Sequence, residues 1–273
     1  MRTRITSLII VSVFVLAFSS VASAQTSFNG RDLTGVWNRT GGNYDVGGEV
    51  PPMTPEGEKR LLANRPSYGR ALGSPLNGEH IGRVRAVPPA IGNDFVGNCN
   101  PSGIPRLLWY VEPFEFITAH AKVAQFFSWE RALREIWTDG RQLPNASALE
   151  SLGPRWYGYS AGKWEGDTFV VETVGLDART WLDHLGYPHS DKVHMEERYR
   201  RVKADTLELD VTITDAEIYA KPWVAGKHTY TLVPKEALTF AGWGGFLEGI
   251  CSPADEQDFN SRVRNPAGGL NEK

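Results

Sequence analysis

The fold is indicated first by residues 206–214, which read TLELDVTIT. Apolar side chains occupy every second position of this stretch, and polar side chains occupy the positions between them. Alternation with a period of two predicts a β-strand with one buried face, as in an antiparallel sheet. Residues 192–202 precede it, and the turn residues Lys203-Ala204-Asp205 join the two stretches into a predicted hairpin. Residues 168–174 (TFVVETV) alternate in the same way, after a predicted turn at Glu165-Gly166-Asp167.

Further strands are predicted on both sides of this hairpin, at residues 34–39, 113–118, 123–129, 132–138, 156–160, 163–164, 228–233 and 238–243. Asp139-Gly140, which follows one of them, predicts a β-hairpin at that point. A short helix is predicted over residues 57–64, because Thr54 suits its N-cap and Pro55 its first position. Residues 65–106 are rich in Gly, Pro and Asn with little periodicity, which predicts an irregular loop or a functional flap.

Many short strands joined by tight turns predict an all-β, mainly antiparallel fold with one short N-terminal helix and long irregular segments. A meander of this length protects its edge strands either by closing into a barrel or by packing two sheets together, and a barrel is the expectation here. No internal repeat or linker divides the chain, so residues 25–273 are expected to form a single β-barrel-like domain.

Composition narrows the classes of function. The 273 residues carry a net charge of −3, so nothing points to a nucleic-acid partner. The nine Trp, nine Tyr and twelve Phe suit an aromatic interior. Walker loops, dinucleotide glycine motifs and Ser nucleophile elbows are absent from the sequence, so no cofactor is expected. A small-molecule ligand is therefore the expected partner, and the oligomeric state is left open.

The first 24 residues predict where the protein works. Arg2 and Arg4 are followed by an uncharged, largely apolar run over residues 5–20 and then by Ala22-Ser23-Ala24, a signal-peptidase pattern. We therefore expect a signal peptide over residues 1–24, a mature chain that begins at Gln25, and a periplasmic or secreted protein. The alternative is a membrane anchor, for which the apolar run is short. No second long apolar run follows, so the mature chain is expected to lack a membrane span.

The chain has two cysteines, Cys99 and Cys251. In an exported protein the simplest expectation is that they form a disulfide. The alternative is two separate thiols. Neither cysteine has a second Cys at metal-ligand spacing, so a cysteine-only metal site is not expected.

The segment Asp32-Leu33-Thr34-Gly35-Val36-Trp37 resembles the opening strand of lipocalin-like barrels, which carry Gly-x-Trp there. In those barrels the Trp closes the floor, so the resemblance implies that Trp37 is buried near one barrel end. The overlapping segment 28–35 also resembles the start of exported jelly rolls similar to 3-keto-glycoside hydrolases.

A longer resemblance spans most of the mature chain. It consists of residues 51–57, 99–106, 136–141, 162–168 (GKWEGDT), 188–190 (PHS), 194–198 (HMEER) and 221–223 (KPW). Together they resemble a widespread family of exported bacterial proteins, and the resemblance implies no particular activity. Members of that family usually have Cys-His-Glu near the C-terminus, where this chain has Cys251-Ser252-Pro253. A role of that His would therefore be lost here.

The densest polar cluster lies between residues 183 and 198 and includes four candidate catalytic residues: Asp183, His189, His194 and Glu197. A neutral His beside a carboxylate is a suitable general base. His189 and His194 are five residues apart and converge only if a turn separates them. Gly186 and Pro188 make such a loop reasonable. Two alternatives stay open: a divalent metal site, although the spacing fits no known ligand motif, and a purely structural role in the loop.

Aromatic and basic residues supply the candidate ligand-binding set, namely Trp164, Tyr219, Trp223 and Arg198. The alternative is that Trp164 packs at the base of a hairpin and that Tyr219 and Trp223 plug one end of the barrel. The leading hypothesis is an exported β-barrel protein that binds a small apolar or aromatic molecule. A periplasmic hydrolase, lyase or isomerase that uses the 183–198 cluster is the alternative, and an interaction protein of the cell envelope is a third possibility.

Overall fold

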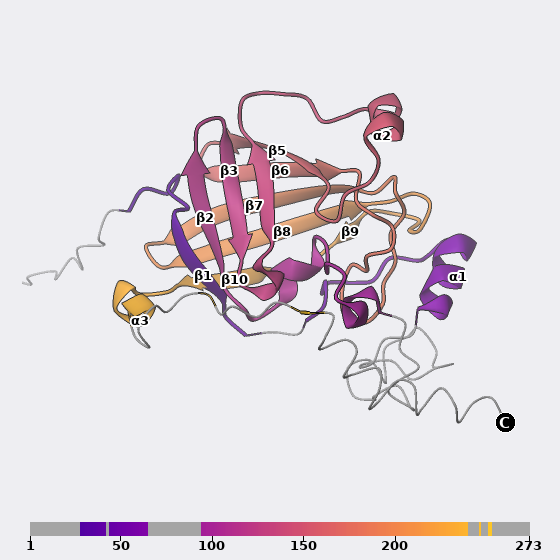
Figure 1. Cartoon of the computed structure of the whole chain (residues 1–273), viewed down its shortest axis with the longest axis horizontal. Helices are drawn as coiled ribbons and strands as arrows, with labels where there is room; N and C mark the ends of the chain where they lie inside the picture. The colour runs from indigo at the N-terminus through magenta and orange to yellow at the C-terminus, as the bar shows by residue number, and fades with distance from the viewer. Residues whose placement is uncertain (1–27, 42–43, 65–93, 240–245, 247–250, 253–273) are drawn as a thin grey trace, which may run out of the picture.

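The computed structural model describes residues 28–41, 44–64, 94–239, 246 and 251–252. Its strands form one sheet in the order β10-β1-β2-β3-β4-β5-β6-β7-β8-β9, and β10 also pairs with β8. This last pairing closes β1 to β8 and β10 into a barrel of nine strands, while β9 (Trp223–Val224) extends the sheet beside β8 (Figure 1). The expected all-β, lipocalin-like barrel is therefore confirmed.

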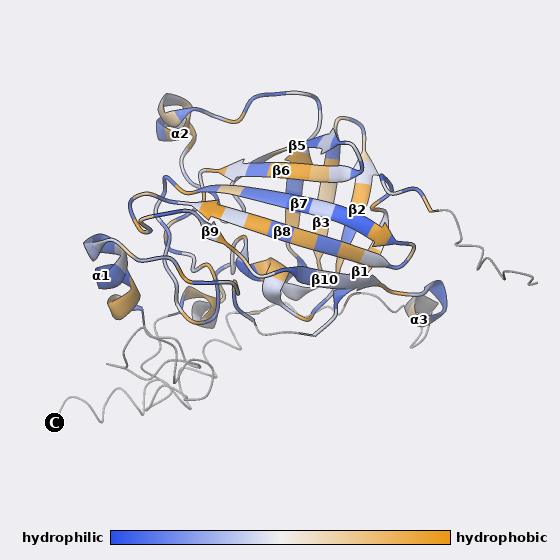
Figure 2. Cartoon of the chain, turned by 180° about the vertical axis from the view of Figure 1, so that it is seen from behind, coloured by the Kyte–Doolittle hydropathy of each residue, from blue (hydrophilic) through white to orange (hydrophobic). Residues whose placement is uncertain are grey.

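Most strands lie where the alternating pattern predicts them. The barrel strands are β1 (Gly35–Arg39), β2 (Phe114–Ala119), β3 (Lys122–Phe127), β4 (Leu133–Trp137), β5 (Tyr159–Glu165), β6 (Thr168–Val174), β7 (His194–Lys203), β8 (Thr206–Thr214) and β10 (His228–Leu232). Tight turns connect β2 to β3, β5 to β6, and β7 to β8. Hydrophobic and hydrophilic residues alternate visibly along β8 (Figure 2). One apolar face of each hairpin thus points into the core.

The connection from β4 to β5 differs from the prediction. Asp139-Gly140 does not start a hairpin, because β4 and β5 run parallel and pair only at Ile136–Ser160 and Trp137–Ala161. The Arg141 guanidinium binds the Asp139 carboxylate and lies 3.5 Å from the Trp137 ring centroid, which closes a local turn that leads the chain away from β4. The return to β5 includes an unpredicted helix, α2 (Ala146–Leu152), whose N-cap Asn145 accepts from Ala148.

Two further helices flank the barrel. In α1 (Pro55–Ala63) the Thr54 hydroxyl accepts from the Gly57 amide and Pro55 takes the first position, as predicted. A strand was expected over residues 238–243, but its first two residues belong to α3 (Lys235–Thr239), where Pro234 precedes the helix. Residues 240–243 lie outside the described residues. Short 3-10 helices, η2 (Phe95–Asn98), η3 (Arg106–Trp109) and η4 (Trp129–Arg131), complete the secondary structure of the described part.

Aromatic side chains fill the barrel interior. Phe114 makes edge or tilted contacts with Phe116, Phe127 and Tyr230, and Phe116 in turn contacts Tyr199. Trp37 is fully buried, as the Gly-x-Trp resemblance predicts. Its indole N–H donates to the Leu33 carbonyl at 2.8 Å, and the Arg201 guanidinium lies 5.4 Å from its ring centroid.

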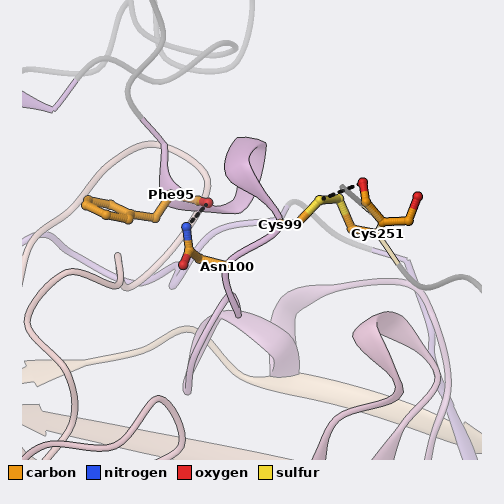
Figure 3. Close-up of a disulfide and its surroundings, with 5 residues drawn as sticks. Phe95, Cys99, Asn100 and Cys251 are labelled. Carbon is orange, nitrogen blue, oxygen red and sulfur yellow. Dashed lines mark hydrogen bonds between the residues drawn. A yellow bond between two sulfur atoms is a disulfide. The ribbon is translucent and has the colours of Figure 1, made fainter. Parts of the chain in front are cut away.

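The expected disulfide is present between Cys99 and Cys251, with a Cα–Cα distance of 5.3 Å (Figure 3). Cys99 ends η2, and the side-chain amide of the next residue, Asn100, donates to the Phe95 carbonyl. The bridge therefore attaches the C-terminal part of the chain to the loop that precedes η3. In the described ranges, no helix has both the length and the apolar character needed to cross a bilayer. The predicted signal peptide, residues 1–24, lies outside these ranges.

Candidate functional site

The structure separates the four candidate catalytic residues. His194 and Glu197 both lie on β7, three residues apart, and an odd separation on a strand places two side chains on opposite faces. His194 faces outward, where its Nε2 lies 3.7 Å from a carboxylate oxygen of Glu172. Glu197 faces inward and is fully buried. The convergence that the enzyme hypothesis requires is thus absent for this pair.

His189 has a buried role in the loop before β7. Its Nδ1 donates to the Ser190 carbonyl at 2.9 Å, and its Nε2 lies 2.8 Å from the Thr180 hydroxyl. Complete burial lowers the pKa of the imidazole, because burial disfavours its charged form. Asp215 holds the adjacent residue by accepting from the Ser190 amide and hydroxyl. These contacts support the structural alternative for His189, because both ring nitrogens are occupied by the protein itself.

Asp183 is also fully buried, and it binds backbone rather than histidine. Its carboxylate accepts from the amides of Val46 and Leu185 at 3.3 and 2.9 Å. Burial raises the pKa of Asp183 to about 7. In the part of the chain that the structure describes, no hydrogen bond or ion pair joins Asp183 to His189 or His194, and no group of three potential ligands is placed to hold a metal ion.

Glu197 belongs to a polar network inside the barrel. Arg134, on β4, donates to both carboxylate oxygens of Glu197 at 2.6 and 2.9 Å, and the Tyr199 hydroxyl donates to the same carboxylate at 2.6 Å. The remaining hydrogen bonds of the Arg134 guanidinium go to Ser160, Gln125 and Thr173. Every N–H of this arginine therefore has a partner, so the pair is not open to an incoming ligand.

This buried network was not predicted, although the sequence carries a signal for it. Arg134 shares the inward face of β4 with Ile136, and Glu197 shares the inward face of β7 with Met195 and Tyr199. A basic and an acidic side chain on two inward faces predict a buried pair, because an isolated buried charge is too costly.

The expected ligand-binding residues do not gather around one cavity. Tyr219 and Trp223 are buried, and they donate hydrogen bonds to the carbonyls of Pro188 and Gly47. Trp164 is half-buried against Phe169 at the β5–β6 hairpin, and Arg198 forms a surface ion pair with Glu165. The contacts agree with the packing alternative for the three aromatic residues.

A cleft of about 660 Å³ lies where β4 and β5 separate in the barrel wall. Its volume falls within the range of small-molecule sites, about 300 to 1,000 Å³. The lining comes from β4, the connection around α2, and the start of β5: Leu133, Arg134, Glu135, Trp137, Arg141, Gln142, Leu143, Pro144, Ala148, Leu152, Pro154, Arg155, Trp156, Tyr157, Gly158, Tyr159, Ser160 and Ala161. In Figure 1, α2 lies beyond the strand ends, apart from the barrel.

The side chains of this cleft, called the β4–β5 cleft from here on, combine aromatic rings with an available cation. Leu133 and Leu152 line it and are 55 % and 54 % exposed, so the cleft presents apolar surface to solvent. The Arg155 guanidinium lies 4.5 Å from the Tyr159 ring centroid and has no acidic partner among the described residues. The buried Arg134 and Ser160 of the interior network also contribute to the lining.

Comparison with known proteins adds no assignment. No protein-family model matches the chain, and no similar protein is found among curated ones. The resemblance to a family of exported bacterial proteins therefore stays a prediction.

Proposed function

We propose that this protein is an exported β-barrel that binds a small aromatic or apolar molecule in the β4–β5 cleft rather than in the barrel interior. The observation that carries the proposal is the exposure of Leu133 and Leu152 in a cleft of ligand size. Exposed apolar side chains in a concavity gain free energy when a ligand covers them. The half-buried rings of Trp137, Trp156 and Tyr159 add apolar surface to the cleft wall, and each has an arginine guanidinium within 4.5 Å of its ring centroid.

The charged side chains of the cleft narrow the chemical class of the ligand further. Glu135 and Arg141 at the cleft are paired with Lys122 and Asp139, respectively. Arg155 is the lining residue with an unpaired charge among those described, and it lies beside an aromatic ring. A ligand with an apolar body and one carboxylate or similar anion matches this arrangement, because its ring stacks on the wall while its anion pairs with the guanidinium.

The barrel interior is a poorer candidate. Aromatic side chains and the Arg134–Glu197 network occupy it, and displacement of either partner would leave a buried charge uncompensated. Breaking such a pair costs about 3–5 kcal/mol, which a small ligand would have to supply before any net binding.

The disulfide supports export. Disulfides persist in oxidising compartments such as the periplasm and the extracellular space. The Cys99–Cys251 bridge and the predicted signal peptide thus favour the same location.

Titration with 2-naphthoate, followed by tryptophan fluorescence, tests the cleft. Leu152→Asp places a charge in the apolar wall and should weaken binding at least tenfold. The matched control is Leu62→Asp, since Leu62 is 56 % exposed, lies near the end of α1 as Leu152 lies at the end of α2, and does not line the cleft. Equal affinity in both variants, or no saturable binding by the wild type, would refute the site.

A second experiment tests whether the anionic group of the ligand pairs with Arg155. Arg155→Gln should weaken 2-naphthoate binding about fivefold, the scale of a partly exposed ion pair, and should leave 2-naphthalenemethanol unaffected. Arg200→Gln is the control, because Arg200 is an exposed arginine on β7 outside the cleft. An equal loss for the neutral alcohol would show that Arg155 only shapes the wall.

A further inference from the structure

A smaller cavity of about 400 Å³ lies beside the disulfide. It is lined by Val96, Cys99, Asn100, Pro101, Trp129, Glu130, Tyr157 and Cys251. Tyr157 also lines the β4–β5 cleft, so the two cavities adjoin across this residue. The smaller cavity contains one ionisable carboxylate, that of Glu130, and the candidate residues of the sequence analysis other than the two cysteines contribute nothing to it.

The protein holds the Glu130 carboxylate firmly in place. The Ser102 amide lies 2.9 and 3.0 Å from its two oxygens, the Ser102 hydroxyl donates at 2.5 Å, and the Tyr157 hydroxyl donates at 3.3 Å. Glu130 and Arg131 both have a left-handed backbone, with φ values of 60° and 53°. Such φ values cost a non-glycine residue about 1–3 kcal/mol and persist only where the surroundings enforce them, often at ligand sites.

Among the described residues, this carboxylate has no directly paired cation. Within the described part of the chain, no Lys, Arg or His side chain forms an ion pair with Glu130, and the nearby Arg106 is instead paired with Asp94 at 2.6 Å. Burial raises the pKa of Glu130, while the Ser102 and Tyr157 donors and the positive charge of nearby Arg106 favour its ionised form. A partly desolvated anion that has hydrogen-bond donors but no directly paired cation is unfavourable, so a bound cation would stabilise the site.

The aromatic walls fit the same conclusion. Trp129 is 41 % exposed, and its ring packs edge-on against Tyr110 with a centroid distance of 5.5 Å. Trp129 and Tyr157 therefore line the same cavity as the carboxylate, and indole and phenol rings attract cations. We infer that this cavity, called the Glu130 cavity below, binds a small organic ammonium ion between Glu130, Trp129 and Tyr157.

The hydrogen bonds define the ligand further. Three protein donors already occupy the carboxylate, so the ligand need not donate a hydrogen bond. A quaternary ammonium group satisfies the charge without an N–H, and its methyl groups fit against the aromatic rings. The cavity volume of about 400 Å³ suits a compact cation rather than a peptide.

Isothermal titration of the disulfide-intact mature protein with choline tests the inference. The matched probe is 3,3-dimethyl-1-butanol, which has the shape of choline with a carbon atom in place of the charged nitrogen. We expect saturable binding of choline and at least tenfold weaker binding of the neutral alcohol. Absence of choline binding, or equal binding of both molecules, would overturn the inference. So would binding to phosphatidylcholine vesicles without binding to free choline, because the inferred ligand is a free cation.

Variants locate the site. Glu130→Gln should weaken choline binding at least tenfold, and Glu58→Gln, which removes an exposed carboxylate of α1 outside the cavity, should leave it within twofold. If Glu130→Gln fails to fold, Trp129→Leu tests whether choline binds in this cavity. This variant keeps the carboxylate and replaces a partly exposed ring, and it should weaken choline binding about fivefold. Unchanged affinity in the folded variants would contradict the site. Binding of 2-naphthoate in the β4–β5 cleft is measured separately and does not depend on this result.

Discussion

Removal of the Glu197 charge should destabilise the barrel strongly. In Glu197→Gln the side chain keeps its size, but the Arg134 guanidinium, 1 % exposed, loses its counter-charge and one of two acceptor oxygens. Breaking a buried ion pair from one side costs about 3–5 kcal/mol, because the remaining charge stays buried and unpaired. We expect Glu197→Gln to lower the free energy of unfolding by this amount. Arg134→Met should cost a similar amount, since it leaves the carboxylate alone.

The double variant separates the charge effect from packing. Without the ion pair, the remaining polar groups still bind one another: the Ser160 and Thr173 hydroxyls lie 3.0 Å apart, and Gln125 donates to the Tyr199 hydroxyl at 3.3 Å. Arg134→Met combined with Glu197→Gln should therefore cost clearly less than the sum of the single variants. We expect a coupling energy above about 2 kcal/mol, within the range found for residues of one buried network.

Urea unfolding, followed by far-ultraviolet circular dichroism, measures these free energies. The control cycle is Glu165→Gln with Arg198→Gln, because Arg198 follows Glu197 on β7 but faces solvent. That cycle should show no measurable coupling. Single variants of the buried pair that cost less than about 1 kcal/mol, or a double variant that costs the full sum, would refute the assignment of Arg134–Glu197 as a mutually dependent pair.

Three further predictions follow from the fold. Trp37→Ala should cost about 3–5 kcal/mol in urea unfolding, because it empties a fully buried indole site, and an unchanged midpoint would contradict this. Intact-mass analysis of the secreted protein should show a chain that begins at Gln25, with no alkylatable thiol until Cys99 and Cys251 are reduced. Reduction should then cost at most about 4–5 kcal/mol on the chain-entropy model, since the bridge closes a loop with a sequence separation of 152. Burial and the nearby Arg39 guanidinium lower the pKa of His228 to about 4. Between pH 6.5 and 4 the folded state thus binds fewer protons than the unfolded state. As the pH falls through this range, this group alone should lower the free energy of unfolding by about 3 kcal/mol. In His228→Gln the free energy of unfolding should fall less steeply with pH. An equal pH slope in both proteins would contradict that role.

The strands could be predicted where one face of the strand is buried and the other is exposed to solvent. Residues 168–174 and 206–214 were expected as strands, and β6 and β8 have those bounds. The turn after β4 could not be predicted, because Asp139-Gly140 suits a hairpin locally and only tertiary pairing decides that β5 runs parallel. The strand predicted to begin at residue 238 was wrong for a similar reason. Alternating apolar residues are also compatible with a short helix, here α3, when Pro234 precedes it.

The candidate site was harder to predict than the fold. Polar residues that are dense in sequence, such as those between 183 and 198, diverge in space because β7 alternates its faces and the preceding loop binds its own backbone. The two cavities instead combine segments far apart in sequence, for example Pro101 and Tyr157, or Leu133 and Tyr159. Local patterns carry no information about such pairings, except where opposite charges share inward faces.

The parallel junction of β4 and β5 explains why the wall opens at this place. Antiparallel neighbours stay paired along their length, whereas these two strands share only two residue pairs before the chain must leave through α2. The Arg134–Glu197 pair joins β4 to β7 across the interior and thereby helps to keep β4 in this position. In turn, α2 has no buried residue, with the β4–β5 cleft on one side and a groove of about 630 Å³ on the other. Because α2 has no buried residue, the Tyr159 hydroxyl, which donates to the carbonyls of Leu152 and Gly153, is a main link between the end of this helix and β5 beside the proposed ligand site.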